Sequence, residues 1–591
     1  MQIMRRARHG PWKRIPLVAT LAVATAAAVA ACGGGGGSST STTAPKATGG
    51  TITVLSAGDV DYIDPGIAYY SFSYTVHYAT QRPLLSYEPD SVQPVPDLAA
   101  KMPTISADGK TVTVQLRKGV KFSPPVDREV TSDDVKYAIE RAFSTSVANG
   151  YVGAYFNVIA GAPAKPTKGV PDISGIQTPD KYTVVFKLER PSGTFVGALS
   201  MLATAPVPRE YAKPFDSKTT SDYGQYQVAT GPYMIKNNAA GKLTGYTPSR
   251  QIELVRNPNW DASTSFRPAY ADRILFKEGF QDPTIVTKQI LSGTADVNGD
   301  VPPPAAQLRS ILGNASQKDQ LTFTPTGGSR YVALNTAKPP FDNLYVRQAV
   351  AYVLDRNAMR LTRGGAIDGE IATHFIDPSF KAAGWEYSGG ASFDPFPSAS
   401  NSGDVQKAKD MLKKAGYANG MYSGPQVTMV ADNVPPGSDT AKVVAANLAK
   451  IGFDVKTISV THSAMYTRFC NVPRNQPNIC PNVGWLPDFH EPETLLNVTF
   501  NGQHIVPVNN SNWPQLNDPA LNAAMDKAAM MLDATARYKA WAKIDQQVTR
   551  TAAAIPWLWE DFPTLYSTNV THASELWNQG SPDVTFMQVR S

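Results

Sequence analysis

The chain has 591 residues, of which 55 are basic and 49 are acidic, giving a formal net charge of +6. Five of the basic residues and none of the acidic ones lie in the first 31 positions, so the rest of the chain carries 50 basic and 49 acidic residues. A balance this even gives no argument for binding nucleic acid or an acidic partner. The length beyond residue 50 exceeds that of one hydrophobic core and predicts two or three lobes.

The N-terminal segment has the layout of a secretory signal, in which basic residues precede an apolar run and a site with small residues. The run at 17–31 has 15 residues, whereas a membrane-spanning helix needs about 20, which makes a transmembrane anchor the weaker interpretation. Val29-Ala30-Ala31-Cys32 resembles a bacterial lipobox. The resemblance implies a lipoprotein signal peptide at 1–31, with Cys32 as the lipidation site and acyl chains holding the protein on the outer face of the cell membrane.

A tether and then the first regular elements follow. Residues 32–50 are rich in Gly, Ser and Thr and predict a flexible tether. Alternating apolar residues predict strands at 51–55 and 111–116. A helix is expected at 131–143, because Thr131 with Asp134 is close to a capping box and apolar residues follow at helical spacing.

The second half of the chain repeats one theme, a helix followed by a glycine and a strand. The expected elements are helices at 408–415 and 441–451, strands at 426–430 and 453–460, and a helix opened by Asp518-Pro519. Helices that alternate with strands favour an α/β architecture. Residues 325–328 are predicted to cross between lobes, since Gly327 and Gly328 tolerate large backbone changes and form a candidate hinge.

Two cysteines remain beyond Cys32, and they are close in sequence. In an exported protein, Cys470 and Cys480 are expected to form a disulfide. The alternative is metal binding, but zinc requires more ligands than two, and no histidine lies at zinc-finger spacing from this pair.

Motifs distributed along the chain resemble those of the family 5 extracellular solute-binding proteins, which include the oligopeptide, dipeptide and nickel receptors of ABC importers. The motifs are Pro96-Asp97-Leu98-Ala99, Ser106-Ala107-Asp108-Gly109-Lys110, Leu116 to Phe122, Thr131 to Val135, Thr230-Gly231-Pro232-Tyr233, Val255-Arg256-Asn257-Pro258, and Pro340 to Arg356. The Asp-Gly that usually follows the Lys-Phe pair is missing, and Ser123-Pro124-Pro125 stands there instead. Order and spacing, rather than any single motif, carry the resemblance.

The resemblance implies a two-lobe periplasmic-binding-protein-like (Venus-flytrap) fold with an extra subdomain on the first lobe. The first lobe would take residues 51–325, with the subdomain at about 88–228, and the second lobe 326–555; residues 556–591 would return to the first lobe. The protein would be a monomeric receptor that encloses a ligand between hinged lobes. It would deliver the ligand to the permease subunits of an ABC importer.

The segment 484–492 is the first candidate for binding. In peptide-binding relatives a matching Gly-Trp-x-x-Asp segment lines the cleft, and its aspartate pairs with the α-ammonium of the peptide; Gly484, Trp485, Leu486 and Asp488 match it. A carboxylate enclosed with an ammonium forms a strong, charge-assisted hydrogen bond. The competing interpretations are a solvated loop aspartate and, for Trp485 and Phe489, ordinary core aromatics.

A second candidate is the tyrosine-rich loop after the first strand, where Tyr69, Tyr70 and Ser71 would face the ligand. The alternative is a packed loop. Tyr331, beside the expected hinge, is a third candidate.

Other functions find less support in the sequence. There is no Gly-x-Ser-x-Gly, phosphate-binding loop or His-Glu-x-x-His, so a hydrolase is a remote alternative and we expect no catalytic residues, cofactor or metal ligands. A nickel-chelate receptor would rest on His490, and a lone loop histidine is more often solvated. An oligosaccharide receptor is the stronger rival, because sugar rings stack on aromatic side chains and the chain has 22 Phe, 25 Tyr and 9 Trp residues.

Overall fold

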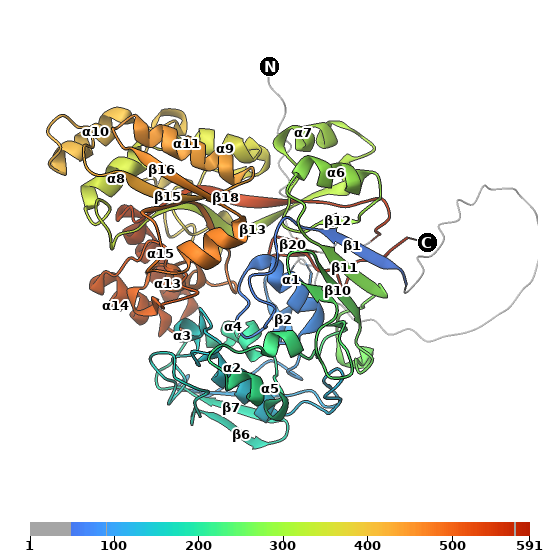
Figure 1. Cartoon of the computed structure of the whole chain (residues 1–591). Helices are drawn as coiled ribbons and strands as arrows, with labels where there is room; N and C mark the ends of the chain where they lie inside the picture. The colour runs from blue at the N-terminus through green and yellow to red at the C-terminus, as the bar shows by residue number, and fades with distance from the viewer. Residues whose placement is uncertain (1–48, 90, 572–574, 591) are drawn as a thin grey trace, which may run out of the picture. The chain divides into compact units, whose positions relative to one another are not determined.

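The computed structural model describes residues 49–89, 91–571 and 575–590 (Figure 1). The predicted signal peptide, the lipidation site Cys32 and the tether up to residue 48 lie outside the described residues. In the described part of the chain, no helix has both the length and the apolar character that crossing a lipid bilayer requires.

The first lobe is built on a mixed sheet of short strands. Their order is β12 (Val297–Asn298), β1 (Thr51–Leu55), β11 (Arg273–Lys277), β10 (Gln251–Arg256) and β8 (Tyr233–Ile235), with β9 (Tyr246–Thr247) paired to β10. β1 runs parallel to both of its neighbours, and its side chains Ile52 and Val54 are fully buried. The helices of this part are α1 (Ser71–Thr80), α6 (Pro283–Leu291) and α7 (Ala305–Gly313).

The second lobe is built on a six-stranded sheet. Its order is β14 (Gly369–Glu370), β18 (Ala554–Leu565), β13 (Leu321–Leu334), β17 (Ile479–Trp485), β15 (Val427–Asp432) and β16 (Val455–Val460). In Figure 1, α9 (Arg356–Arg363), α10 (Val405–Lys414) and α11 (Gly437–Ala449) lie on one side of it, with α8 (Leu344–Val353) beside α10. On the other side lie α13 (Glu493–Phe500), α14 (Pro519–Ala529) and α15 (Ala534–Arg550).

A third, antiparallel sheet lies within the span expected to be the extra subdomain. Its order is β4 (Thr104–Ile105), β5 (Thr111–Gln115), β7 (Thr183–Lys187) and β6 (Ile176–Asp180). The helices nearby in sequence are α2 (Ser132–Ala142), α3 (Val152–Tyr155), α4 (Phe195–Ala198) and α5 (Arg209–Asp216). Two small hairpins, β2 (Leu85–Tyr87) with β3 (Pro94–Pro96) and β19 (Glu575–Leu576) with β20 (Ser581–Pro582), complete the sheets. The α/β fold class is confirmed, and the lobe boundaries stay predictions.

Local capping chemistry explains why the predicted helices begin where they do. At the start of α2, the backbone N–H of Thr131 donates to Asp134 Oδ2 at 2.8 Å, and the reciprocal bond of the capping box is also present. At the start of α14, Asp518 Oδ1 accepts from the N–H groups of Ala520 and Leu521.

The two lobes are joined by a long antiparallel ribbon, β13 with β18, which runs across Figure 1. Pairing is interrupted between Pro325 and Ser329, so Gly327 and Gly328 lie in a bulge of a strand rather than in a loop. Gly327 has φ +69°, and a Cβ atom on Gly328 would collide with the backbone oxygen of Trp485. Both positions therefore require glycine for their geometry, and their role as a hinge stays a prediction.

Cys470 and Cys480 are joined by a disulfide. Cys480 lies on β17, and Cys470 ends the helical turn that carries Tyr466. A hydrogen bond also links β17 to this helical turn, because the backbone N–H of Gly484 donates to the Tyr466 hydroxyl at 3.0 Å.

Candidate functional site

A cavity of about 250 Å³ lies where strands of the two large sheets end. Its lining includes the segments that follow β1, β12, β15, β16 and β17, and both strands of the ribbon. In open α/β sheets, ligands bind outside the carboxyl ends of strands, because the loops there can present side chains without disturbing the sheet. The cavity is therefore the candidate binding site.

Most of the residues predicted from sequence line this cavity. They are Tyr69, Tyr70, Ser71, Gly484, Trp485, Leu486 and Asp488. Tyr331 is not among the lining residues, because its side chain is only 1% exposed and packs against the rings of Phe375 and Trp513. Neighbouring side chains on a strand point to opposite faces, and it is Arg330 that faces the cavity. The third candidate thus has a packing role.

Asp488 follows β17 and is partly exposed to the cavity. Both the Tyr69 and the Tyr155 hydroxyls donate to its Oδ2, at 2.8 and 2.5 Å. Within the described residues, Oδ1 has no hydrogen-bond partner and no cation forms an ion pair with the carboxylate. Burial raises the pKa of Asp488 to about 7, although the two tyrosine hydroxyls act to lower it.

The residues around Asp488 form a rigid wall. The Trp485 indole N–H donates to the Thr494 carbonyl at 2.7 Å, and its ring meets Tyr69 edge to face at 5.3 Å. A Cβ atom on Gly484 would lie 3.2 Å from Arg330 Nη1, so a larger residue would crowd the guanidinium. These contacts fix the wall before a ligand arrives, which reduces the entropy cost of binding.

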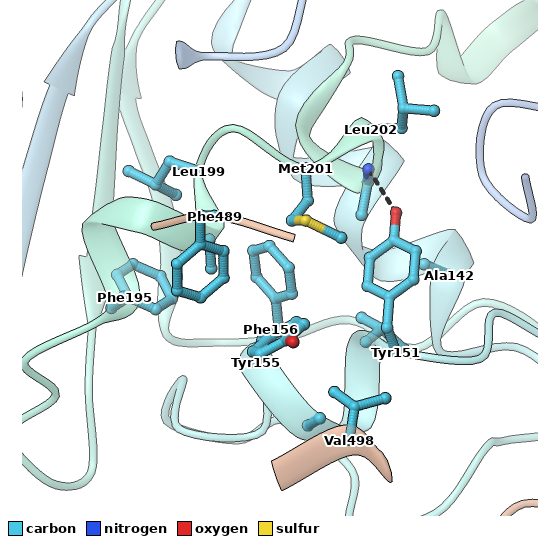
Figure 2. Close-up of a cluster of buried hydrophobic side chains, with 14 of the residues drawn as sticks. Ala142, Tyr151, Tyr155, Phe156, Phe195, Leu199, Met201, Leu202, Phe489 and Val498 are labelled. Atoms are coloured by element: carbon cyan, nitrogen blue, oxygen red, sulfur yellow. Dashed lines mark hydrogen bonds between the residues drawn. The ribbon is translucent and has the colours of Figure 1, made fainter. Parts of the chain in front are cut away.

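Phe489 and His490 do not line the cavity. Phe489 is 1% exposed, and Figure 2 shows it with Val498 among side chains from residues 142–202. The His490 ring stacks on Phe380 at 4.5 Å, and burial lowers the pKa of His490. Their surroundings are those of packed side chains.

The tyrosine-rich loop is fastened by Asp61. Its Oδ2 accepts from the backbone N–H groups of Tyr69 and Tyr70 at 2.9 and 3.0 Å, and the Ser73 hydroxyl donates to its Oδ1 at 2.6 Å. Burial raises the pKa of Asp61, against the effect of these hydrogen bonds. The start of α1 is therefore held where Tyr69, Tyr70 and Ser71 reach the cavity.

An ion network in the cavity lining has no signal in the sequence. Arg330 Nε donates to both carboxylate oxygens of Glu560, at 2.9 and 2.8 Å, and Arg363 Nη2 donates to Glu560 Oε1 at 2.5 Å. Burial acts to raise the pKa of Glu560, but the two arginines hold it below its ordinary value. Glu560 lies on β18 opposite the bulge of β13, so the network joins the cavity to the ribbon.

A second polar group in the lining was also missed. His462 Nδ1 lies 2.8 Å from Asp432 Oδ1, and Asn482 Nδ2 donates to Asp432 Oδ2 at 3.3 Å. Burial lowers the pKa of His462, and the Asp432 carboxylate more than offsets this, so the net shift is upward. Across from this pair, the Tyr70 hydroxyl donates to Asp300 Oδ2 at 3.4 Å.

Glu278, directly after β11 and outside the cavity lining, is expected to give the stability of the protein a pH dependence. Glu278 is 7% exposed, and burial together with the negative charges of Asp59 and Asp300 raises its pKa from 4.5 to about 9. The folded state therefore binds more protons than the unfolded state between pH 4.5 and about 9. Stability falls as pH rises through this window, by at most about 1.4 kcal/mol per unit.

We expect Glu278→Gln to remove this dependence. The free energy of unfolding of the variant should exceed that of the natural protein by about 1–3 kcal/mol at pH 8 and by much less at pH 5. Thermal unfolding at both pH values measures the difference. Glu386→Gln, at an exposed position, is the control and should gain nothing at either pH. An equal gain from Glu278→Gln at the two pH values would contradict the assignment.

The described residues contain no group of three or more His, Cys, Asp or Glu side chains that could hold a metal ion. The cavity can instead offer carboxylate oxygens, aromatic faces and backbone groups to an organic ligand.

Comparison with known proteins gives a consistent picture. The sequence profile of the bacterial extracellular solute-binding proteins, family 5 middle region, matches residues 93–506, more than half of the chain. Among curated proteins, the chain is 27% identical over 485 residues to a heme-binding protein A of Haemophilus influenzae, covering 80% of each chain. It is 25% identical over 442 residues to a di/tripeptide-binding protein 3 of Pseudomonas aeruginosa, covering 73% of this chain and 75% of the other.

Solved structures share the fold over nearly the whole chain. The clavulanic acid biosynthesis oligopeptide binding protein 2 matches with a TM-score of 0.76 and 26% identity, covering 93% of this chain and 97% of the other. The periplasmic binding protein DppA from Helicobacter pylori, solved with the peptide STSA, matches with a TM-score of 0.76 at 19% identity, covering 92% of this chain and 99% of the other. The two-lobe fold predicted from the sequence is confirmed by these matches.

Proposed function

Because the chain belongs to the family 5 bacterial extracellular solute-binding proteins, we propose that it captures a short peptide in its cavity and delivers it to an ABC importer. The family is one of transport receptors rather than enzymes, so binding and release replace catalysis. The proposal of a peptide ligand rests on Asp488, whose carboxylate lines the cavity and has no cationic partner among the described residues.

The α-ammonium of a peptide suits this carboxylate. The Tyr69 and Tyr155 hydroxyls both donate to Asp488 Oδ2, which leaves Asp488 Oδ1 as an acceptor for an N–H donor of the ligand. A buried carboxylate without a cation is costly, and pairing with an ammonium relieves that cost through charge-assisted hydrogen bonds. Backbone groups of the Gly484 segment can then bind the peptide main chain without reading its side chains.

The position of the receptor in the cell is part of the same proposal. The basic and apolar segment before Cys32 and the lipobox-like Val29-Ala30-Ala31-Cys32 support export and lipid anchoring at the outer face of the cell membrane. The permease subunits of an ABC importer would receive the peptide from a monomeric receptor. The glycines of the β13 bulge, Gly327 and Gly328, are the proposed hinge.

Binding of matched peptides tests the function directly. We expect trialanine to raise the thermal midpoint of the purified protein, by the equivalent of about 2.7 kcal/mol at 100 times its Kd, and N-acetyl-trialanine to have little effect. Equal shifts of the thermal midpoint with the two peptides would show that the α-ammonium does not contribute to binding. No shift from any peptide of two to five residues would contradict the peptide function.

An oligosaccharide is the second candidate, because Trp485, Tyr69 and Tyr70 all line the cavity and sugar rings stack on aromatic faces. Oligosaccharides and nickel chelates therefore belong in the same thermal-shift measurement. A midpoint that rises with a sugar and not with peptides would favour that alternative.

A further inference from the structure

We propose that the cavity binds a second positive charge of its ligand, the guanidinium or ammonium side chain of a basic residue, at Asp300. This inference rests on the proposed peptide function and specifies the class of peptide. The site consists of Asp300, the rings of Tyr70 and Tyr466, and Asn482, all of which line the cavity; we call it the Asp300 subsite.

Asp300 lines the cavity and has no ion-pair partner of its own; the positive charge of His462 acts on it from nearby, but that imidazole is paired with Asp432. Asp300 Oδ1 accepts from the backbone N–H of Ala57 at 2.7 Å, and its Oδ2 is approached by the Tyr70 hydroxyl at the long distance of 3.4 Å. In the part of the chain that the structure describes, no Lys, Arg or His forms an ion pair with Asp300. A carboxylate withdrawn from water in this way favours a cation from the ligand.

The basic side chains of the lining are already engaged. Arg330 and Arg363 both donate to Glu560, and His462 contacts Asp432. The lining carries five carboxylates against these three basic groups; the carboxylates are Asp61, Asp300, Asp432, Asp488 and Glu560. The cavity therefore has an excess of negative charge, which attracts a cationic ligand.

Independent features of the subsite suit a donor-rich cation. The rings of Tyr70 and Tyr466 lie 5.7 and 5.2 Å from the ring of His462 and bring two aromatic faces to this end of the cavity. A guanidinium stacks on such faces. Asn482 is 2% exposed, its Nδ2 donates to Asp432, and its Oδ1 has no partner within the described residues. That oxygen is a buried acceptor without a partner, of the kind that a group with several N–H donors satisfies.

The competing interpretation gives Asp300 only a structural role, in which its Oδ1 fastens the loop after β1 through Ala57. Asp300→Asn separates the two roles, because asparagine keeps an acceptor for the Ala57 N–H but removes the charge. If the role is only structural, the ratio of the affinities for basic and neutral peptides should be the same in the variant as in the natural protein.

The test compares arginine with citrulline, which has nearly the same shape and no charge. Isothermal titration measures trialanine and the six tripeptides in which one alanine is replaced by arginine or by citrulline. For at least one position we expect the arginine peptide to bind about 10- to 100-fold more tightly than its citrulline partner. In Asp300→Asn that ratio should fall to near one, while Asp319→Asn, at an exposed position, should keep it.

The outcomes separate this inference from the proposed function. If the tripeptides bind, and each arginine peptide has the same affinity as its citrulline partner at every position, the Asp300 subsite is wrong and the peptide receptor stands. If arginine is preferred but Asp300→Asn keeps the preference, the subsite is also wrong. If no peptide binds, both proposals fail. The comparison in the unmodified protein does not depend on the folding of a variant.

Discussion

Asp488→Asn should lower the affinity for a peptide with a free α-amino group by roughly 100-fold at pH 8. Asparagine keeps the size of the side chain and an oxygen that the Tyr69 and Tyr155 hydroxyls can donate to, so the wall is preserved. What the substitution removes is the charge that pairs with the ammonium. Titration calorimetry with trialanine measures the loss, and Asp439→Asn, at a half-exposed aspartate of α11 that does not line the cavity, serves as the control.

The same contact predicts how affinity depends on pH. Burial raises the pKa of Asp488 to about 7, and a cationic group binds the ionised carboxylate. Affinity for trialanine should therefore fall as pH decreases from 7 to 5, approaching about tenfold per unit, whereas Asp488→Asn should show no such slope. An unchanged affinity in the variant, or a slope that the variant retains, would remove Asp488 from the site.

The sequence predicts the fold better than it predicts the site, for a physical reason. Helix caps such as Thr131 with Asp134 involve residues close in sequence, and the family motifs follow one another in order along the chain. Both can therefore be recognised from the sequence alone. The Asp488 segment was found in the same way. Tyr331 was misplaced because alternation along a strand decides which face a residue takes, and one position separates it from Arg330.

The rest of the lining depends on contacts between distant parts of the chain. Tyr155 reaches Asp488 across 333 positions of sequence, and Arg330 reaches Glu560 across 230. No spacing rule links such residues, and an isolated Asp300 is indistinguishable from a surface aspartate until the fold places it at the cavity. These residues became visible only through tertiary structure.

Glu560→Ala should be among the most destabilising single substitutions in the cavity lining. The Glu560 carboxylate is the common partner of Arg330 and Arg363, and all three side chains are largely buried, with 6%, 16% and 6% exposure. Removing one partner of a buried ion pair leaves uncompensated charge and costs about 3–5 kcal/mol, because the remaining group is not rehydrated. The loss can be measured as a lower midpoint in urea and thermal unfolding. Glu210→Ala is the matched control: this glutamate also contacts an arginine, Arg128, but it is 61% exposed and should cost less than about 1 kcal/mol.

The sign of the pH dependence distinguishes lost charge pairing from lost packing. The two arginines hold the pKa of Glu560 below its ordinary value of 4.5, so its contribution is fully present above that pH and disappears as pH falls through the lower folded-state value. The stability difference between the natural protein and Glu560→Gln, which keeps the shape, should therefore shrink on acidification below about pH 4.5. A difference that stays constant down to pH 3 would mean that packing, and not charge, holds the ribbon to the cavity wall.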